Sequence, residues 1–364
     1  MNSTTLPLPT GISDPLARAR ELVLAYGWNA TSYQIVNPGI QLWFARDGDA
    51  VVGYVERHLT RVVAGAPVCA PDRLLSVVEE FEQDCQDCRR RVCYFGAENR
   101  LETLLRRRQT HSMVLLGSQP SWNPTHWAGI VAGKASLRAQ LNRARNKGIT
   151  VAVMPSAEAT NSPALRRVLD EWLATRGLPP MHFLVEPETL ARLFDRRVLI
   201  ARSREGPVVA FLVASPAPAR GGWLVEQFVR GARAPNGTVE LLLDTAMRSL
   251  AADGFEYVTL GLAPLSRHSL PQAVNPLWLR MTLKVVRAHG RRFYNFEGLD
   301  RFKAKFQPER WEPVYAIVNE RHFSPGALYA IAAAFSDGSP ASTIGRALWR
   351  AARTELRWLR RRLK

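Results

Sequence analysis

Acidic and basic side chains gather around one predicted strand–loop–helix unit in the second half of the chain. Glu226 and Arg230 lie near the end of a predicted strand, and Asn236 lies in the Pro-Asn-Gly loop that follows. Glu240 falls in the first turn of the next predicted helix, which Thr238 is expected to cap. A strand-end acid beside a helix N-terminus can bring a base and backbone N–H groups to a reacting carbonyl. We therefore predict two catalytic candidates, Glu226 and Glu240, and two substrate-binding candidates, Arg230 and Asn236; an ordinary strand–turn–helix explains the pattern equally well.

A second group alternates cations with aromatic rings near the end of the chain. Its basic members are Arg301, Lys303 and Lys305, and Trp311 is among the aromatic residues. Such a mixture suits a phosphate backbone with stacked bases, or a phospholipid head group beside acyl chains. These four residues are predicted to bind substrate, with a plain amphipathic helix–strand unit as the alternative. Upstream, residues 261–266 directly follow a predicted strand, and the small residues among them allow a backbone to approach a ligand closely. A tight structural turn explains them equally well.

The charge of the chain indicates a polyanionic partner. The 364 residues carry a formal net charge of +17 at neutral pH, with a pI of about 10.5. Nucleic acid and an anionic membrane surface both fit this excess, and solubility in an arginine-rich proteome is the alternative. Part of this positive charge lies on a predicted helix over residues 135–147. The cations of this helix are Arg138, Arg143, Arg145 and Lys147.

Metal, redox and membrane-spanning classes are disfavoured by the sequence. Cys85 and Cys88 form a C-x-x-C pair, but no second pair has ligand spacing, and four scattered cysteines fit a reducing cytoplasm. We expect no metal site and no cofactor. No signal peptide precedes the first predicted helix, and no apolar run reaches the ~18 residues that a membrane span needs.

The predicted elements indicate an α+β protein in two domains with a tail. Helices and strands alternate without a regular βαβ repeat. Asp14 before Pro15 and Ser162 before Pro163 predict helix starts, Gly148 predicts the end of the basic helix, and a further helix is predicted over residues 187–194. We predict an N-terminal domain over residues 1–125, a catalytic domain over 126–323 and a tail over 324–364. Within the tail, residues 344–364 place leucines and tryptophan on one helix face and arginines on the other. This pattern predicts a membrane-surface helix; packing on the domain and tRNA binding are the alternatives.

Three runs of sequence together resemble a known family. They are P-N-G-T-x-E-L-L at residues 235–242, G-L-A-P-L-S at 261–266, and N-F-E-G-L-x-R-F-K-A-K-F-x-P-x-x-W-E-P at 295–313. In this order they resemble the synthase domain of phosphatidylglycerol lysyltransferases, the C-terminal part of the multiple peptide resistance factor. Residues 65–68 and the basic segment 137–148 also match, so the resemblance covers about residues 20–320.

The resemblance implies a fold and a reaction. The fold is a tandem of two GCN5-related N-acetyltransferase (GNAT) folds with mixed sheets. The reaction moves an aminoacyl group, lysyl or alanyl, from aminoacyl-tRNA to a hydroxyl of phosphatidylglycerol, without a cofactor, as in antimicrobial peptide resistance. The expected partners are aminoacyl-tRNA, on the basic helix 135–147, and the anionic lipid at the cytoplasmic face of the membrane, where the protein is expected to lie peripherally.

One departure from the family pattern concerns the acceptor, and one loop residue distinguishes the chain from acetyl-CoA enzymes of the same fold. Glu226 stands where the family usually has Asp, and the following Arg is one place later, at Arg230. This puts the choice of acceptor lipid in doubt. Pro235 removes an N–H from the loop that would hold the pyrophosphate of coenzyme A, which disfavours an acyl-CoA donor. An acyl-CoA-dependent N-acyltransferase, a transferase acting on a peptidoglycan precursor and a non-catalytic membrane- or nucleic-acid-binding protein remain the alternatives.

Overall fold

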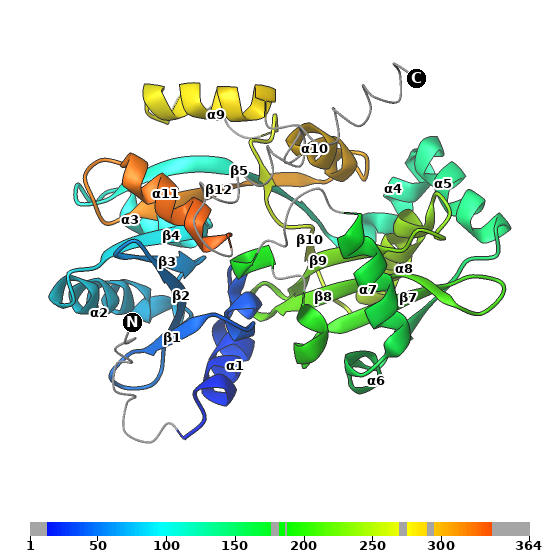
Figure 1. The fold of residues 1–364 in the computed structure, drawn as a ribbon, viewed down its shortest axis with the longest axis horizontal. Helices are drawn as coiled ribbons and strands as arrows, with labels where there is room; N and C mark the ends of the chain where they lie inside the picture. Colours follow the sequence, from blue (N-terminus) through cyan, green and yellow to red (C-terminus); the bar gives the residue numbers. More distant parts are fainter. Residues whose placement is uncertain (1–12, 176–181, 186–187, 269–274, 290–294, 337–364) are drawn as a thin grey trace, which may run out of the picture.

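One continuous mixed β-sheet runs through the whole molecule (Figure 1). The computed structural model describes residues 13–175, 182–185, 188–268, 275–289 and 295–336. The strand order is β1-β2-β3-β4-β12-β5-β10-β9-β8-β7-β6, and the short β11 pairs with β5 beside this path. The pairs β3–β4 and β9–β10 are parallel, and the other pairs in the order are antiparallel. The expected α+β class with a mixed sheet is therefore confirmed.

The N-terminal half of the sheet is covered on both faces by helices. Its strands are β1 (Gln41–Phe44), β2 (Val51–Arg57), β3 (Thr60–Ala64), β4 (Arg91–Ala97), β5 (Ser112–Trp122) and β12 (Arg310–Val318). Its helices are α1 (Pro15–Tyr26), α2 (Leu74–Asp87), α3 (Asn99–Leu105), α9 (Leu277–His289) and α11 (Pro325–Ala334), with the 3-10 turns η1 (Ser32–Val36) and η2 (Pro71–Arg73).

The C-terminal half repeats this layered plan beside the first. Its strands are β6 (Thr150–Met154), β7 (Arg197–Arg202), β8 (Val208–Ala217), β9 (Gly222–Arg230), β10 (Tyr257–Thr259) and β11 (Ala263–Pro264). Its helices are α4 (Trp127–Gly133), α5 (Ala135–Asn146), α6 (Ser156–Thr160), α7 (Pro163–Ala174), α8 (Thr238–Ala252) and α10 (Phe296–Ala304). Its 3-10 turns are η3 (Pro124–His126), η4 (Phe183–Val185), η5 (Thr189–Arg192) and η6 (Pro218–Arg220).

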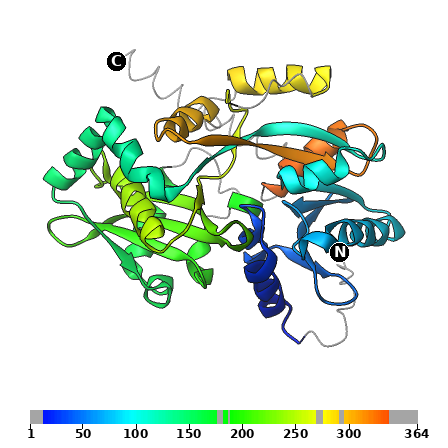
Figure 2. The ribbon, with the colours of Figure 1, turned by 180° about the vertical axis from the view of Figure 1, so that it is seen from behind.

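Successive side chains along the strands pack into two separate hydrophobic cores, one on each face of the sheet. In β7, Leu199 and Ala201 pack under α8, whereas Val198 and Ile200 face the opposite side with α7. Successive side chains of a strand point to opposite faces, so a strand buried on both faces reads as continuously apolar. Figure 2 shows α8 across the back of this half, with α4 and α5 beside it.

Local helix signals predict several helices correctly and two details wrongly. Asp14 caps α1 by accepting from the N–H groups of Leu16 and Ala17, as expected from Asp-Pro at its start. The predicted helix over residues 187–194 is wrong, because the structure has only the short turn η5 there. Thr238 does not cap α8: Gly237 is the N-cap residue, and the Thr238 hydroxyl donates to the Pro235 carbonyl instead.

The last strand returns to the first half of the sheet. β12 pairs with β4 and β5, although the sequence assigns it to the second domain, and α11 packs on β2 and β3, although the sequence assigns it to the tail. The domain limits themselves stay a prediction. The amphipathic segment 344–364 lies outside the described residues. None of the helices within the described residues is long and apolar enough to cross a bilayer.

Candidate functional site

The candidate site begins where two parallel strands stop pairing. β9 and β10 run side by side only from Gly222–Tyr257 to Leu224–Thr259. β9 then continues to Arg230, while the chain after β10 turns at Gly261, which has a φ of 69°, and joins β5 through β11. Glu226 lies on the part of β9 beyond its pairing with β10, but in the middle of the strand rather than at its end as the sequence predicts, because β9 stays paired with β8 as far as Arg230.

α10 docks on the loop that follows β10. The Lys303 ammonium donates to the carbonyls of Leu260, Gly261 and Leu262, each at 2.8 Å. Asp300, one turn earlier on α10, accepts from the Ser266 hydroxyl at 2.5 Å. Lys303 is 5% exposed, and its burial lowers its pKa to about 7, although the nearby Asp300 opposes this shift. Lys303 therefore fastens α10 to the loop, which is a different contact from the predicted phosphate contact.

The same helix is joined to α8 and β9. The Lys305 ammonium lies 2.6 Å from a Glu240 carboxylate oxygen and over the rings of Phe302 and Phe306. Phe302 also meets the ring of Phe228 on β9, with ring centroids 5.8 Å apart. Glu240 is 9% exposed, so this predicted catalytic acid is a buried partner of Lys305 at the start of α8. Three motifs that are distant in sequence thus meet around α10.

Two predicted substrate-binding residues lie on α10 and at the start of β12. Arg301 is exposed and forms an ion pair with Glu297 one turn away, at 2.7 Å. Trp311, at the start of β12, stacks on His268 with the ring centroids 4.4 Å apart. Both side chains stand near the docked loop, and both remain candidates for contact with a ligand.

Glu226 is held by a buried arginine from the turn before β7. The Arg196 Nε donates to Glu226 Oε1 at 2.9 Å, and the two side chains are 0% and 7% exposed. Arg196 also donates to Asn37 and Ser215, at 2.6 and 3.2 Å, and its guanidinium lies over the ring of Tyr33. Because Asn37 and Tyr33 belong to the N-terminal half, this network fixes the acid at the junction between the two halves.

The loop between β9 and α8 is held by hydrogen bonds within the protein. Arg230 donates to the Ala234 carbonyl at 2.7 Å and to the Asn236 side chain at 3.2 Å, so these two predicted residues are brought together. The N–H groups of Gly231 and Ala232 donate to the Val209 carbonyl and to Glu171 Oε2. These two N–H groups are thus engaged within the protein.

The cations of the basic helix α5 are exposed, and two of them also bond within the protein. Arg145 is paired with the buried Asp244 of α8 at 3.0 Å, and Arg138 donates to carbonyls at the end of α4. Arg143 and Lys147 are exposed on the outer face of the helix. All four predicted tRNA contacts therefore lie on exposed residues, and two of them, Arg138 and Arg145, also bond within the protein.

A second buried charge network lies between the halves, and the sequence analysis missed it. Arg220 donates to Glu98 at 2.8 Å and, with both terminal nitrogens, to Glu312 at 2.6 and 2.8 Å. The Tyr257 hydroxyl lies 2.9 Å from Arg220 and 3.2 Å from Glu312. Burial raises the pKa of Glu98 to about 7, and Arg220 opposes the shift. Only Glu312 carried a signal in the sequence, as the acid of the Trp-Glu-Pro run.

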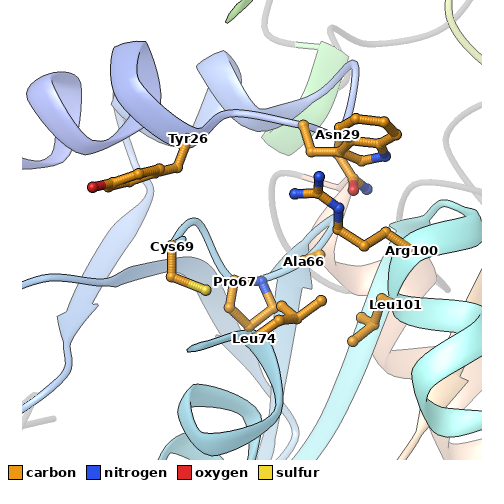
Figure 3. A pocket seen from close by; sticks show the side chains of 9 residues that line it. Tyr26, Asn29, Ala66, Pro67, Cys69, Leu74, Arg100 and Leu101 are labelled. Carbon is orange, nitrogen blue, oxygen red and sulfur yellow. The ribbon is translucent and has the colours of Figure 1, made fainter. Parts of the chain in front are cut away.

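A small pocket adjoins this network (Figure 3). Trp28 lines it and lies under both Arg100, at 4.0 Å, and Arg220, at 5.3 Å from the ring centroid. The figure shows Asn29 facing Arg100, and Cys69 lying below Tyr26. The cavity volume is about 10 Å³, roughly one water-sized sphere, which is too small for an aminoacyl ester.

No cluster of three or more metal-ligating side chains occurs in the part of the chain that the structure describes. Within that part, Cys88 is exposed whereas Cys85 is buried, and burial raises the pKa of the Cys85 thiol to about 12. A thiol with a raised pKa is a poor metal ligand and nucleophile.

Comparison with known proteins identifies the family. The model for the C-terminal domain of phosphatidylglycerol lysyltransferase matches residues 20–318. The chain belongs to this family. A phosphatidylglycerol lysyltransferase of Staphylococcus xylosus is 24% identical over 322 residues, which make up 85% of this chain and 36% of that protein. The chain thus spans about a third of the length of the curated relatives that it matches.

Solved structures share the fold of this family member. L-PGS from Bacillus licheniformis is 23% identical with a TM-score of 0.74, and the match covers 90% of this chain and 98% of that one. The C-terminal (DUF2156) domain of an Agrobacterium fabrum protein assigned as a lysylphosphatidylglycerol synthetase is 24% identical with a TM-score of 0.75. That match covers 89% of this chain and 98% of the other. The family and fold expected from the three sequence runs are confirmed.

Proposed function

We propose that this domain transfers an aminoacyl group, lysyl or alanyl, from aminoacyl-tRNA to a hydroxyl of phosphatidylglycerol. The observation that carries the proposal is the family match over residues 20–318, which includes the three runs that meet around α10. The proposed site of action is the cytoplasmic face of the membrane, with the protein bound peripherally to anionic lipid.

In the proposed reaction, the oxygen of the lipid hydroxyl attacks the ester carbonyl that joins the amino acid to the tRNA 3′ end. The new ester bond forms, the bond to the tRNA oxygen breaks, and the proton of the lipid hydroxyl passes to that oxygen. Glu226 is the proposed proton carrier, oriented by its contact with Arg196. The N-terminus of α8 supplies backbone N–H groups for the oxyanion. Because the aminoacyl ester is already reactive, the main contribution of the protein to the rate is to position the two substrates.

The proposed substrate contacts follow the exposed charges. Arg143 and Lys147 on α5 are proposed to bind the tRNA backbone, while Arg301 and Trp311 are proposed to contact the lipid head group or the tRNA end. Lys303 and Glu240 hold α10 in place, so their effect on the reaction is through positioning.

The test uses the purified chain, tRNA charged with labelled lysine or alanine, and phosphatidylglycerol vesicles without coenzyme A. Labelled lipid should form, and ribonuclease treatment before the reaction should abolish it. A Glu226→Gln variant serves as the control for turnover. Transfer that survives ribonuclease and needs an acyl-CoA would refute the proposal in favour of the acetyltransferase class, and charged tRNA consumed by a different acceptor would correct the lipid assignment.

A further inference from the structure

The helix α9 presents a mixed apolar and basic face to solvent. Leu277 and Met281 are 66% and 62% exposed, and Arg280 and Lys284 are exposed beside them. The four residues are spaced three and four apart, so they share one face of the helix. Residues 277–289 contain no acidic residue.

The inner side of α9 is fixed to the sheet. Asn275, just before the helix, exchanges two hydrogen bonds with the backbone of Leu115 on β5, at 2.7 and 3.0 Å. Leu279 is 1% exposed in the N-terminal core, and Trp278 and Leu283 pack against that core. Because the buried side is anchored in this way, the face of Leu277, Arg280, Met281 and Lys284 is held outward.

The position of this face connects it to the site. In Figure 1, α9 lies along the outer edge of the molecule, beside α10 and beyond β5 and β12. The chain continues from α9 to α10, which carries Lys303 and Lys305. A contact made by α9 would therefore hold the α10 region close to whatever α9 touches.

We propose that this face of α9 docks on an anionic lipid bilayer. Exposed Leu and Met side chains can enter the boundary between head groups and acyl chains, while flanking Arg and Lys side chains pair with the phosphates. An acidic protein surface would use the cations but leave two exposed apolar side chains without a partner. The inference rests on the proposed function, since it places the acceptor lipid at the site, and it names the surface that meets the membrane.

A label on α9 tests the contact directly. Met281→Cys is made in a Cys88→Ser background, because Cys88 is exposed and Cys69, Cys85 and Cys93 are buried. The introduced thiol carries an environment-sensitive fluorophore. The matched control is Val153→Cys in the same background, since Val153 is 56% exposed on β6 in the other half.

Phosphatidylcholine vesicles containing phosphatidylglycerol should shift the emission of the label at position 281 to the blue, and pure phosphatidylcholine should do so much less. The label at position 153 should not respond. No shift at position 281 would overturn the inference. A shift that grows with protein concentration without vesicles would also overturn it, because a second copy of the chain would then cover this face.

Substitutions separate the apolar and charged parts of the face. Arg280→Gln with Lys284→Gln should weaken the vesicle response roughly thirtyfold, because each cation near an anionic surface contributes a factor of about five. Added salt should reduce the difference. The double substitution Leu277→Ser and Met281→Ser is tested in the transfer assay. It should lower transfer to phosphatidylglycerol in vesicles but not transfer to a short-chain, water-soluble acceptor.

The fluorescent label tests membrane docking and the transfer assay tests the proposed function, so the two hypotheses can be refuted independently. If the label shifts but no aminoacyl lipid forms from charged tRNA, the proposed function is wrong and the membrane contact stands. If transfer to bilayers is normal while position 281 does not respond, the proposed function stands and the docking face is wrong. Because the label reports on position 281 alone, binding through other parts of the chain does not mimic the result.

Discussion

Replacing Lys303 by methionine should destabilise the fold while leaving the outer face of α10 intact. Lys303 is 5% exposed and supplies the donor for three carbonyls of residues 260–262. Methionine keeps a similar length but donates no hydrogen bond. A buried acceptor that loses its donor costs about 1–3 kcal/mol.

The expected cost follows from the burial of the three carbonyl residues. Leu260 is buried, whereas Gly261 and Leu262 are partly exposed and can bond to water instead. One full penalty and two partial ones give a loss of about 2–4 kcal/mol in the free energy of unfolding. The matched control is Arg301→Met on the same helix, where a 71% exposed side chain pairs only with Glu297. That change should cost about 0.5 kcal/mol or less.

Urea unfolding followed by circular dichroism compares the two variants with the original chain. Binding to phosphatidylglycerol vesicles is measured on the folded proteins in parallel. The reasoning is refuted if Lys303→Met unfolds at an unchanged urea concentration but loses lipid or tRNA binding. In that case the amine contacts substrate, as the alternation of basic and aromatic residues first indicated.

Two further changes test the junction between the halves, and a third tests the packing of α5 against the start of α8. Burial raises the pKa of Glu98 from 4.5 to about 7, so the folded state holds this proton more tightly and stability falls as the pH rises from 4.5 to 7. The fall amounts to about 3 kcal/mol at 1.36 kcal/mol per pKa unit, and it should disappear in Glu98→Gln when urea midpoints are compared across this range. Glu226→Gln should lower turnover about a hundredfold in the transfer assay. Because glutamine still accepts a hydrogen bond from Arg196, the folded fraction at low urea should stay unchanged. Near-normal turnover in this variant would show that Glu226 has a structural role. Gly237 has a φ of 96°, and an added Cβ would lie 2.2 Å from the Gln140 carbonyl oxygen. Gly237→Ala should therefore lower the free energy of unfolding by ~2–4 kcal/mol, through backbone strain and displacement of α5. An unchanged urea midpoint would contradict this packing.

Local chemistry made the secondary structure largely predictable. Asp14 before Pro15, Ser162 before Pro163 and Gly148 after the basic helix mark helix ends that the structure confirms. These signals act within a few residues, so they do not depend on the rest of the fold. The helix predicted over residues 187–194 failed because its apolar residues serve the core next to β7, where Leu190 and Leu193 are buried.

The partners of the charged residues were not predictable in the same way. Arg196 meets Glu226 across 30 positions, Arg220 meets Glu98 across 122, and neither spacing has a period that indicates contact. Residue types showed that Lys303 and Lys305 could bind anions. They did not show that Lys303 is buried against carbonyls, because burial is decided by which face of α10 meets the loop.

The sheet order explains why the two halves must be read together. β12 enters the N-terminal half directly after α10 has docked on the C-terminal half, so residues 296–318 join the two without a break in described structure. The same segment contacts α8 through Lys305 and delivers Glu312 to Arg220. Substitutions that loosen α10 should therefore disturb both halves, which a linear division of the sequence at residue 125 does not anticipate.

This arrangement has a consequence for the choice of acceptor lipid. The departure from the family pattern lies at Glu226 and Arg230, yet Arg230 is bound to the loop through Ala234 and Asn236, and Glu226 is fixed by Arg196. Two exposed cations, Arg267 after the docked loop and Arg301 on α10, instead share Glu297. Head-group selection by this domain is therefore expected to depend more on these outer arginines than on the exposed Arg230 of β9, because the Arg230 guanidinium already donates to the Ala234 carbonyl and the Asn236 side chain.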